Sequence, residues 1–488
     1  MFTVRPRPHA RRRAHPASLF EPLEDRRLLA GVTLVTHGQV NGSLGNWLDT
    51  MAATIITEFV PDAALGRITI DRNLNVSTNF NANPAQSSSA EAVVVLDWSD
   101  AAGGLFSPTN DTFEIALAAA QQLLRTDLVP GFGRALAELP LHLIGFSRGG
   151  SVVSEIAREL GRAGIWVDQV TTLDPYPRGG DAPVGTPTTV AFADNYHQTL
   201  DLFIQGANLG TQAYDRTITS LPGGYSGISA DHSDMHLWYQ GTIDTLGDAP
   251  DGDATLTNAN RASWYLPGES LGTFAGFAYS RLALNARYST QAPAGMDQLI
   301  AGVHPALGGT GTRQSLSQAN ATWPNVLRIT GPASLIPGRE AAFNVTYAEP
   351  DSGAYVTLLL DPDTNPYNGN EIDLAEQPVI GTGGVALTAQ LFGQASSTAN
   401  GTYHILARIG DGPARERVAY AADTIEISRM FDPGFAPSFA SASAEPSMIF
   451  VGPPGRPAGP TVIGSLNASI TASTNAPNLF WYASGTRA

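Results

Sequence analysis

The sequence predicts an α/β fold, in which helices flank a parallel-type sheet, followed by an all-β, sandwich-like domain. From Gly31 to about residue 245, short apolar runs alternate with helical patterns, as in a parallel sheet with helical crossovers. Beyond Val326 the apolar positions recur with a period of two, which is typical of strands. With 488 residues the chain is too long for one compact core, so two or three domains are expected.

The α/β part is expected to alternate buried strands with amphipathic helices. Its predicted helices, at 113–124 and 151–160, carry apolar residues at helical spacing. Its predicted strands are Val32–Thr36, Val93–Asp97, Leu141–Ile144, Val167–Leu173 and Thr188–Phe192. In the second part, strands are predicted at Ala341–Tyr347, Tyr355–Leu360, Val385–Leu391, Tyr403–Ile409 and Val418–Ile427.

These patterns divide the chain into five segments. The last is dense in Pro, Ala and Ser, and we expect it to be disordered. The segments are a basic N-terminal segment at 1–30, the α/β domain at 31–310, a linker at 311–325, the β-sandwich domain at 326–430 and a tail at 431–488.

The composition excludes several kinds of chemistry. All 28 basic residues are Arg, so Ser–Lys dyads and Schiff-base lysines are ruled out. No Cys is present, which rules out disulfides, thiol catalysis and Cys-ligated zinc. A net charge of −16 argues against nucleic acid and anionic membranes as partners. No apolar stretch approaches the roughly 20 residues that span a bilayer.

The strongest local signal is the pattern Gly-x-Ser-x-Gly at 145–149, between a predicted strand and a predicted helix. In that context it is the signature of a nucleophile elbow, a tight turn that lifts the hydroxyl of Ser147 clear of the sheet. The following helix directs its positive end toward developing negative charge. The alternative is a Gly-rich turn with a surface serine. We predict that Ser147 is a nucleophile.

A serine nucleophile needs a base, and the base needs a carboxylate to orient it. With this elbow the acid is expected after the serine, and the histidine after the acid. Asp174 lies at the end of a predicted strand and is the predicted acid. Asp194, just past the next predicted strand, is the rival acid. The carboxylate that is not the acid is expected to be structural.

Two histidines, His232 and His236, lie downstream of both acids in a polar and aromatic cluster. His232 is the predicted base, in a loop just before a helix start, and His236 is expected to pack one turn further on. The pair also has zinc-ligand spacing, but Ser233 stands where a zincin carries Glu, so no metal is predicted there.

An oxyanion formed at the serine needs two backbone donors. The amide of Arg148, directly after the nucleophile, is the first predicted donor. The amide of Gln39, after the strand that ends in His37-Gly38, is the second. A simple chain turn is the alternative explanation for His37-Gly38.

Taken together, these motifs resemble the lipase branch of the α/β-hydrolases, particularly the pancreatic-type lipases, over about residues 31–245. The matching places are His37-Gly38, Leu96-Asp97-Trp98, Ser147, Leu173-Asp174-Pro175 and His232. The resemblance implies an α/β-hydrolase catalytic domain and favours Asp174 over Asp194. The chain departs from those lipases at Phe146 and Arg148, where they usually have His and Leu, and it lacks the cysteines of their lid.

The N-terminal segment carries a basic run at 5–13 and lacks the apolar region of an ordinary secretory signal. Its Leu-Glu-Asp-Arg-Arg-Leu-Leu core, at 23–29, resembles a segment of extracytoplasmic planctomycete proteins, which implies a secreted or cell-envelope location. A disordered basic leader is the alternative.

One loop of the second part, Asp361–Glu371, is crowded with oxygen ligands, as a calcium loop would be. It departs from an EF-hand at Pro366 and Ile372, and a hairpin turn on Asn368-Gly369 explains it as well. Calcium is therefore an open alternative, and no other cofactor is predicted.

The sequence thus predicts a serine hydrolase that cleaves carboxylic esters, on a small-molecule or lipid substrate, with Ser147, Asp174 and His232 as its triad. The rival hypothesis is a non-catalytic adhesion or envelope protein that retains the same fold. Neither acyl-chain preference nor oligomeric state follows from the sequence.

Overall fold

The structure is a computed structural model that describes residues 31–40, 44–103, 110–266, 275–277, 313–337, 339–390, 400–412, 415–427, 448–449 and 463–464. The predicted N-terminal segment at 1–30 lies outside this range, as does nearly all of the predicted tail at 431–488. The chain divides into two compact units, Met1–Ser428 and Arg429–Ala488. Two short paired strands, β17 (Met448–Ile449) and β18 (Ile463–Gly464), are described in the second unit.

Among the described residues, eight strands of the first unit form one sheet in the order β3-β2-β4-β1-β5-β6-β7-β8. Every neighbouring pair is parallel except β2 and β3. The predicted parallel-type sheet is thus present as a mixed sheet with one antiparallel edge. The strands are β1 (Val32–Thr36), β2 (Ala64–Ile70), β3 (Val76–Phe80), β4 (Ala92–Asp97), β5 (Leu141–Phe146), β6 (Val167–Leu173), β7 (Val190–Gln198) and β8 (Tyr214–Ile218).

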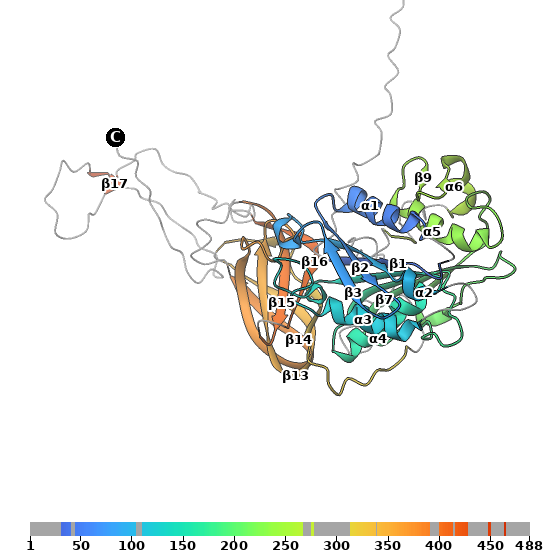
Figure 1. The fold of residues 1–488 in the computed structure, drawn as a ribbon. Helices are drawn as coiled ribbons and strands as arrows, with labels where there is room; N and C mark the ends of the chain where they lie inside the picture. The colour runs from blue at the N-terminus through green and yellow to red at the C-terminus, as the bar shows by residue number, and fades with distance from the viewer. Residues whose placement is uncertain are drawn as a thin grey trace, which may run out of the picture. The chain divides into compact units, whose positions relative to one another are not determined.

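Helices cover both faces of this sheet. Parallel strands must be joined by crossover connections, and such connections usually contain a helix that packs on a face of the sheet. Core residues of α3 and α4 pack on one face, and those of α1 and α5 pack on the other (Figure 1). The central strand β5 is buried along its whole length. The helices are α1 (Trp47–Phe59), α2 (Ser99–Ala102), α3 (Thr112–Leu123), α4 (Gly149–Arg162), α5 (Ala230–Ile243) and α6 (Asn258–Trp264), and a short hairpin of β9 (Ala249–Pro250) and β10 (Thr255–Leu256) follows α5.

Two predicted boundaries near the site are wrong. Strand β7 runs from Val190 to Gln198, so Asp194 lies within the strand rather than past it. Helix α5 begins at Ala230, after Ser229 in the left-handed conformation at φ 64°, so His232 lies in the first helical turn rather than in a loop.

The second sheet consists mainly of antiparallel strands that curl, and its short edge strand β12 pairs with β16 in parallel. Strand β13 pairs with β14 along most of its length, while its other edge passes from β11 to β15. Its register shifts between Glu349 and Ala354, and such irregularities bend a strand. The predicted strands at 341–347 and 355–360 are therefore parts of one. The strands are β11 (Asn325–Thr330), β12 (Ser334–Leu335), β13 (Glu340–Asp361), β14 (Ile372–Gln390), β15 (Gly401–Gly410) and β16 (Glu416–Ile427).

The second sheet is joined to the α/β part by buried polar contacts. The Arg417 guanidinium donates to the carbonyl oxygens of Ala137 at 2.6 Å and Trp166 at 2.8 Å, and lies 3.2 Å from a carboxylate oxygen of Asp168. The Asn325 side chain accepts from the Trp166 amide at 2.9 Å. Ala137 precedes β5, Trp166 precedes β6 and Asp168 is the second residue of β6, so the contacts lie at the amino ends of those strands. A separate sandwich domain and linker stay a prediction.

No helix in the described part of the chain is both long and apolar enough to cross a membrane.

The Arg417 contacts predict that the second sheet and the α/β part stabilise each other. Arg417→Ala should lower the free energy of unfolding by about 3–5 kcal/mol, because it removes a buried cation from the Asp168 carboxylate and from the carbonyl groups of Ala137 and Trp166. Urea unfolding followed by circular dichroism measures this. Arg125→Ala is the matched control, since Arg125 pairs with Asp127 at the surface, and it should leave stability unchanged. Equal effects of the two substitutions would show that the buried contact does not couple the two parts.

Candidate functional site

The turn between β5 and α4 forces Ser147 into an unusual backbone conformation. Ser147 has φ 55°, a region that residues with a side chain rarely adopt. Its amide donates to the Leu173 carbonyl at 2.8 Å, which ties the turn to β6. A Cβ on Gly145 would overlap the carbonyl of Gly149, so the chain can turn this tightly only because glycine stands there. The sharp strand-to-helix turn predicted from the sequence is present.

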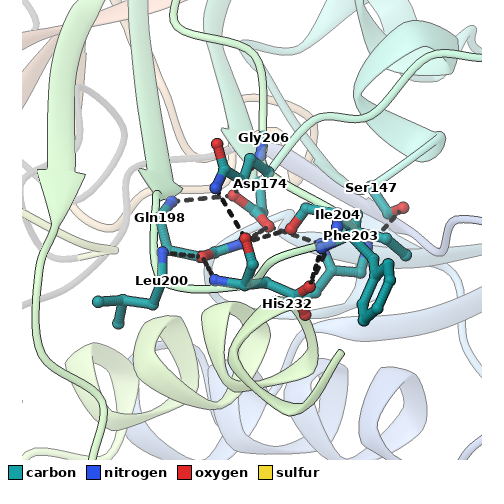
Figure 2. Close-up of polar contacts among 10 residues, drawn as sticks. Ser147, Asp174, Gln198, Leu200, Phe203, Ile204, Gly206 and His232 are labelled. Atoms are coloured by element: carbon teal, nitrogen blue, oxygen red, sulfur yellow. Dashed lines mark hydrogen bonds and ion pairs between the residues drawn. The ribbon is translucent and has the colours of Figure 1, made fainter. Parts of the chain in front are cut away.

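The structure brings Ser147, His232 and Asp174 together from three separate elements (Figure 2). The Ser147 Oγ lies 2.8 Å from His232 Nε2, and His232 Nδ1 lies 2.6 Å from Asp174 Oδ2. The ionised carboxylate accepts only, so Nδ1 carries a proton and Nε2 is left to accept the hydroxyl proton of Ser147. The side chains of all three residues are largely shielded from solvent, Asp174 completely.

Asp174 is held as a carboxylate by four donors. Its Oδ1 accepts from the amides of Gln198 and Gly206, each at 2.9 Å. Its Oδ2 accepts from Gln198 Nε2 at 2.9 Å as well as from His232. These bonds fix the position of the Asp174 side chain beside His232. The sequence analysis did not predict Gln198 as a hydrogen-bond partner of Asp174. Its position at the end of the strand beside β6 is the feature that could have indicated this.

The rival acid, Asp194, lies in a different network. Its Oδ1 accepts from the Thr171 hydroxyl at 2.5 Å, and its Oδ2 accepts from the Tyr196 hydroxyl at 3.0 Å. Gln169 Nε2 contacts both oxygens at 3.2 Å. Asp194 lies inside β7, and its side chain bonds to residues of β6 and β7. It therefore does not reach the carboxyl ends of the strands, where His232 lies.

His236 supports the site from behind rather than joining it. Its ring stacks on Trp47 at 4.2 Å, and its Nδ1 lies 3.1 Å from Asp251 Oδ2. Burial lowers the pKa of His236, which Asp251 partly opposes. Phe146 packs between the two histidines, with ring centroids 4.7 Å from His232 and 4.8 Å from His236. Within the described residues, no group of three or more His, Asp or Glu is placed to hold a metal.

Gly38, which precedes the predicted donor Gln39, lies against Ser147 and Arg148. A Cβ on Gly38 would lie 2.5 Å from the Ser147 Cβ and 3.0 Å from the Arg148 amide nitrogen, so Gly38 makes this close approach possible. His37 Nε2 accepts from the Trp98 amide at 3.0 Å, which leaves Nδ1 to donate to the Gly38 carbonyl at 2.7 Å. Because a peptide unit is planar and trans, that contact turns the Gln39 N–H away from the His37 ring.

The candidate calcium loop at 361–371 uses its oxygens as hydrogen-bond acceptors. Asp361 accepts from the Asp363 amide and the Tyr420 hydroxyl, and Asp363 in turn accepts from the side-chain amides of Asn368 and Asn370. Burial raises the pKa of Asp361 to about 7. Calcium binding at this loop stays a prediction.

No protein-family model matches the chain, and no curated protein matches it. Three solved structures are distantly similar. A Lactobacillus plantarum protein whose name suggests a cell surface hydrolase shares 12% identity and a TM-score of 0.28, over 44% of this chain and 91% of its own. A Listeria innocua gene product shares 13% and 0.22, over 30% and 51%. A PKD domain of an M14-like peptidase from a Thermoplasmatales archaeon shares 19% and 0.14, over 22% and 92%. Likenesses of this size establish no shared activity.

Asp234, a buried carboxyl group near the site, is expected to make the stability of the protein depend on pH. Burial raises the pKa of Asp234, on the first turns of α5, to about 7. The unfolded chain loses this proton near pH 4 and the folded chain near pH 7, so the free energy of unfolding falls as the pH rises through that window. Asp234→Asn removes this loss and should stabilise the protein at pH 8 by on the order of 1–2 kcal/mol, allowing for solvent screening.

Urea unfolding of wild type and Asp234→Asn at pH 4.5 and pH 8 measures that difference. The contribution of Asp361 is common to both proteins and cancels. A difference of the same size at both pH values would contradict the assignment to Asp234.

Proposed function

We propose that the protein is a serine hydrolase that cleaves carboxylic esters through an acyl-enzyme on Ser147. The observation that carries the proposal is the pair of hydrogen bonds that His232 makes, 2.8 Å to Ser147 Oγ and 2.6 Å to Asp174 Oδ2. A hydroxyl bonded to an imidazole that a buried carboxylate orients is the arrangement that activates serine for acyl transfer. We further propose that this hydrolase is an esterase similar to the pancreatic-type lipases.

In the first half of the reaction, His232 Nε2 takes the proton of Ser147 while Oγ attacks the ester carbonyl carbon. The carbonyl oxygen becomes negatively charged and accepts from the amides of Gln39 and Arg148. Within the described ranges neither amide donates to another group of the chain, so both are free for this task. Collapse of the tetrahedral intermediate breaks the ester C–O bond, and the imidazolium gives its proton to the departing alcohol.

In the second half, water attacks the acyl-enzyme and gives a proton to His232. Collapse of the second tetrahedral intermediate breaks its bond to Ser147 Oγ and releases the carboxylic acid, and the His232 imidazolium returns the proton to Oγ. Asp174 stays ionised throughout and stabilises the imidazolium that forms in each half. The negative charge of each intermediate also faces the amino end of α4, whose dipole is favourable there.

We also propose that the protein acts outside the cytoplasm, in the secreted or cell-envelope compartment, on the strength of the motif at 23–29. A non-catalytic envelope protein with the same fold is the outcome that the next experiment distinguishes from an enzyme.

Fluorophosphonate labelling tests the nucleophile. The wild type should be labelled at one site, because the probe traps an activated serine. Ser147→Ala should abolish the labelling, since the reacting oxygen is gone. In-gel fluorescence with mass mapping of the labelled peptide is the measurement. Ser151→Ala, one turn along α4, is the matched control and should be labelled normally. A folded wild type that takes up no probe would favour the envelope protein.

The acid is tested by two conservative substitutions. Asp174→Asn should lower kcat for a p-nitrophenyl ester by about 10⁴-fold, because the amide cannot hold His232 in the required tautomer. Asp194→Asn should leave kcat within a few fold, since Asp194 does not contact His232. Thermal melts confirm that both variants fold. Loss of activity in Asp194→Asn alone would make Asp194 the acid.

A further inference from the structure

The side chain of Arg148 is enclosed beside the elbow although it is charged. Its Nε and Nη2 donate to the two carboxylate oxygens of Asp181 at 2.8 Å and 2.6 Å, and both side chains are nearly free of solvent. Such a bidentate pair fixes the guanidinium in one plane as well as neutralising it. Arg148 stands where the lipases that the sequence resembles usually have Leu.

The remaining donors of Arg148 reach the segment that follows β4. Nη1 donates to the Ala102 carbonyl at 3.3 Å, and Nη2 donates to the Asn110 carbonyl at 2.7 Å. The guanidinium carbon also lies 5.1 Å from the centre of the Trp98 ring. The Arg148 side chain is thus held from several sides, and it in turn holds the backbone from which it starts.

The second proposed oxyanion donor is anchored at the same place. Gln39 Nε2 donates to the Ala102 carbonyl at 2.9 Å and also contacts the Gly103 carbonyl. The Ala102 carbonyl at the end of α2 therefore accepts from the side chains of both residues whose amides are the proposed oxyanion donors. A single fixed oxygen links two backbone segments that are far apart in the sequence.

We propose that Arg148 and Gln39 act as positioning residues through their side chains, in addition to the use of their amides. Asp181 and the Ala102 carbonyl set the separation of the two amides from each other and from Ser147. This matters because oxyanion donors must lie within about 2.7–3.1 Å of the developing charge, and one lost donor costs about 10²–10³ in kcat. The inference rests on the ester hydrolysis proposed above.

The test replaces Asp181 by Asn, which keeps the shape of the side chain and removes its charge. Hydrolysis of a short-chain p-nitrophenyl ester is measured, with kcat expressed per serine titrated by the fluorophosphonate. We expect kcat to fall about 10–100-fold while KM stays within about twofold, because the interaction is made in the transition state. Binding of a trifluoromethyl ketone, which forms a tetrahedral adduct with the serine, should weaken by the same factor.

A second variant, Gln39→Met, removes the hydrogen bond from the Gln39 side chain to the Ala102 carbonyl. Gln39 is partly exposed, so this variant can be measured even if Asp181→Asn does not fold. Asp100→Asn is the matched control, because it removes an exposed carboxylate of α2 that pairs with Arg72, and its kcat should be unchanged.

Unchanged kcat per titrated serine in the folded variants overturns the positioning role, even if less protein folds. A wild type that is neither labelled nor active overturns the ester hydrolase as well, so the two failures are distinguishable.

Discussion

The whole site depends on how tightly the chain packs around the end of β5. The parallel pairing of β1, β5 and β6 brings three carboxyl ends to one edge of the sheet. The loop after β1 then presses on the elbow so closely that Gly38 has no room for a Cβ beside Ser147. This contact holds the loop that carries Gln39 beside Ser147 and Arg148. His232 comes from α5, later in the chain, and contacts both Ser147 and Asp174, which the sheet holds in place.

Polar groups divide between the two ends of this sheet according to task. At the carboxyl ends they converge on Ser147 and are held by second partners, as Gln198 holds Asp174 and Asp181 holds Arg148. At the amino ends, Arg417 uses a buried cation to join the second sheet. The residues around Ser147 and the contacts that attach the second sheet therefore lie at opposite ends of the same strands. A substitution at one end need not disturb the other end.

The sharp turn at Ser147 and the grouping of Ser147, Asp174 and His232 could be predicted, because each residue stands in a short, recognisable stretch of sequence. Their partners could not. Gln198 reaches Asp174 through the register of β6 and β7, and Asp181 reaches Arg148 through the course of a loop, neither of which shows in local patterns. Asp194 was misplaced because β7 extends beyond its apolar residues into a polar stretch. The curl of β13 was missed because a bulge interrupts the period of two.

The attachment of the second sheet also decides where mechanical load would travel. The chain leaves the first unit after β16, which is paired on one side with β15 and on the other with β12. At the start of the same strand, Arg417 binds the carbonyl groups of Ala137 and Trp166. A pull on β16 would thus reach the α/β sheet through Arg417, at the ends of β5 and β6 that lie away from Ser147.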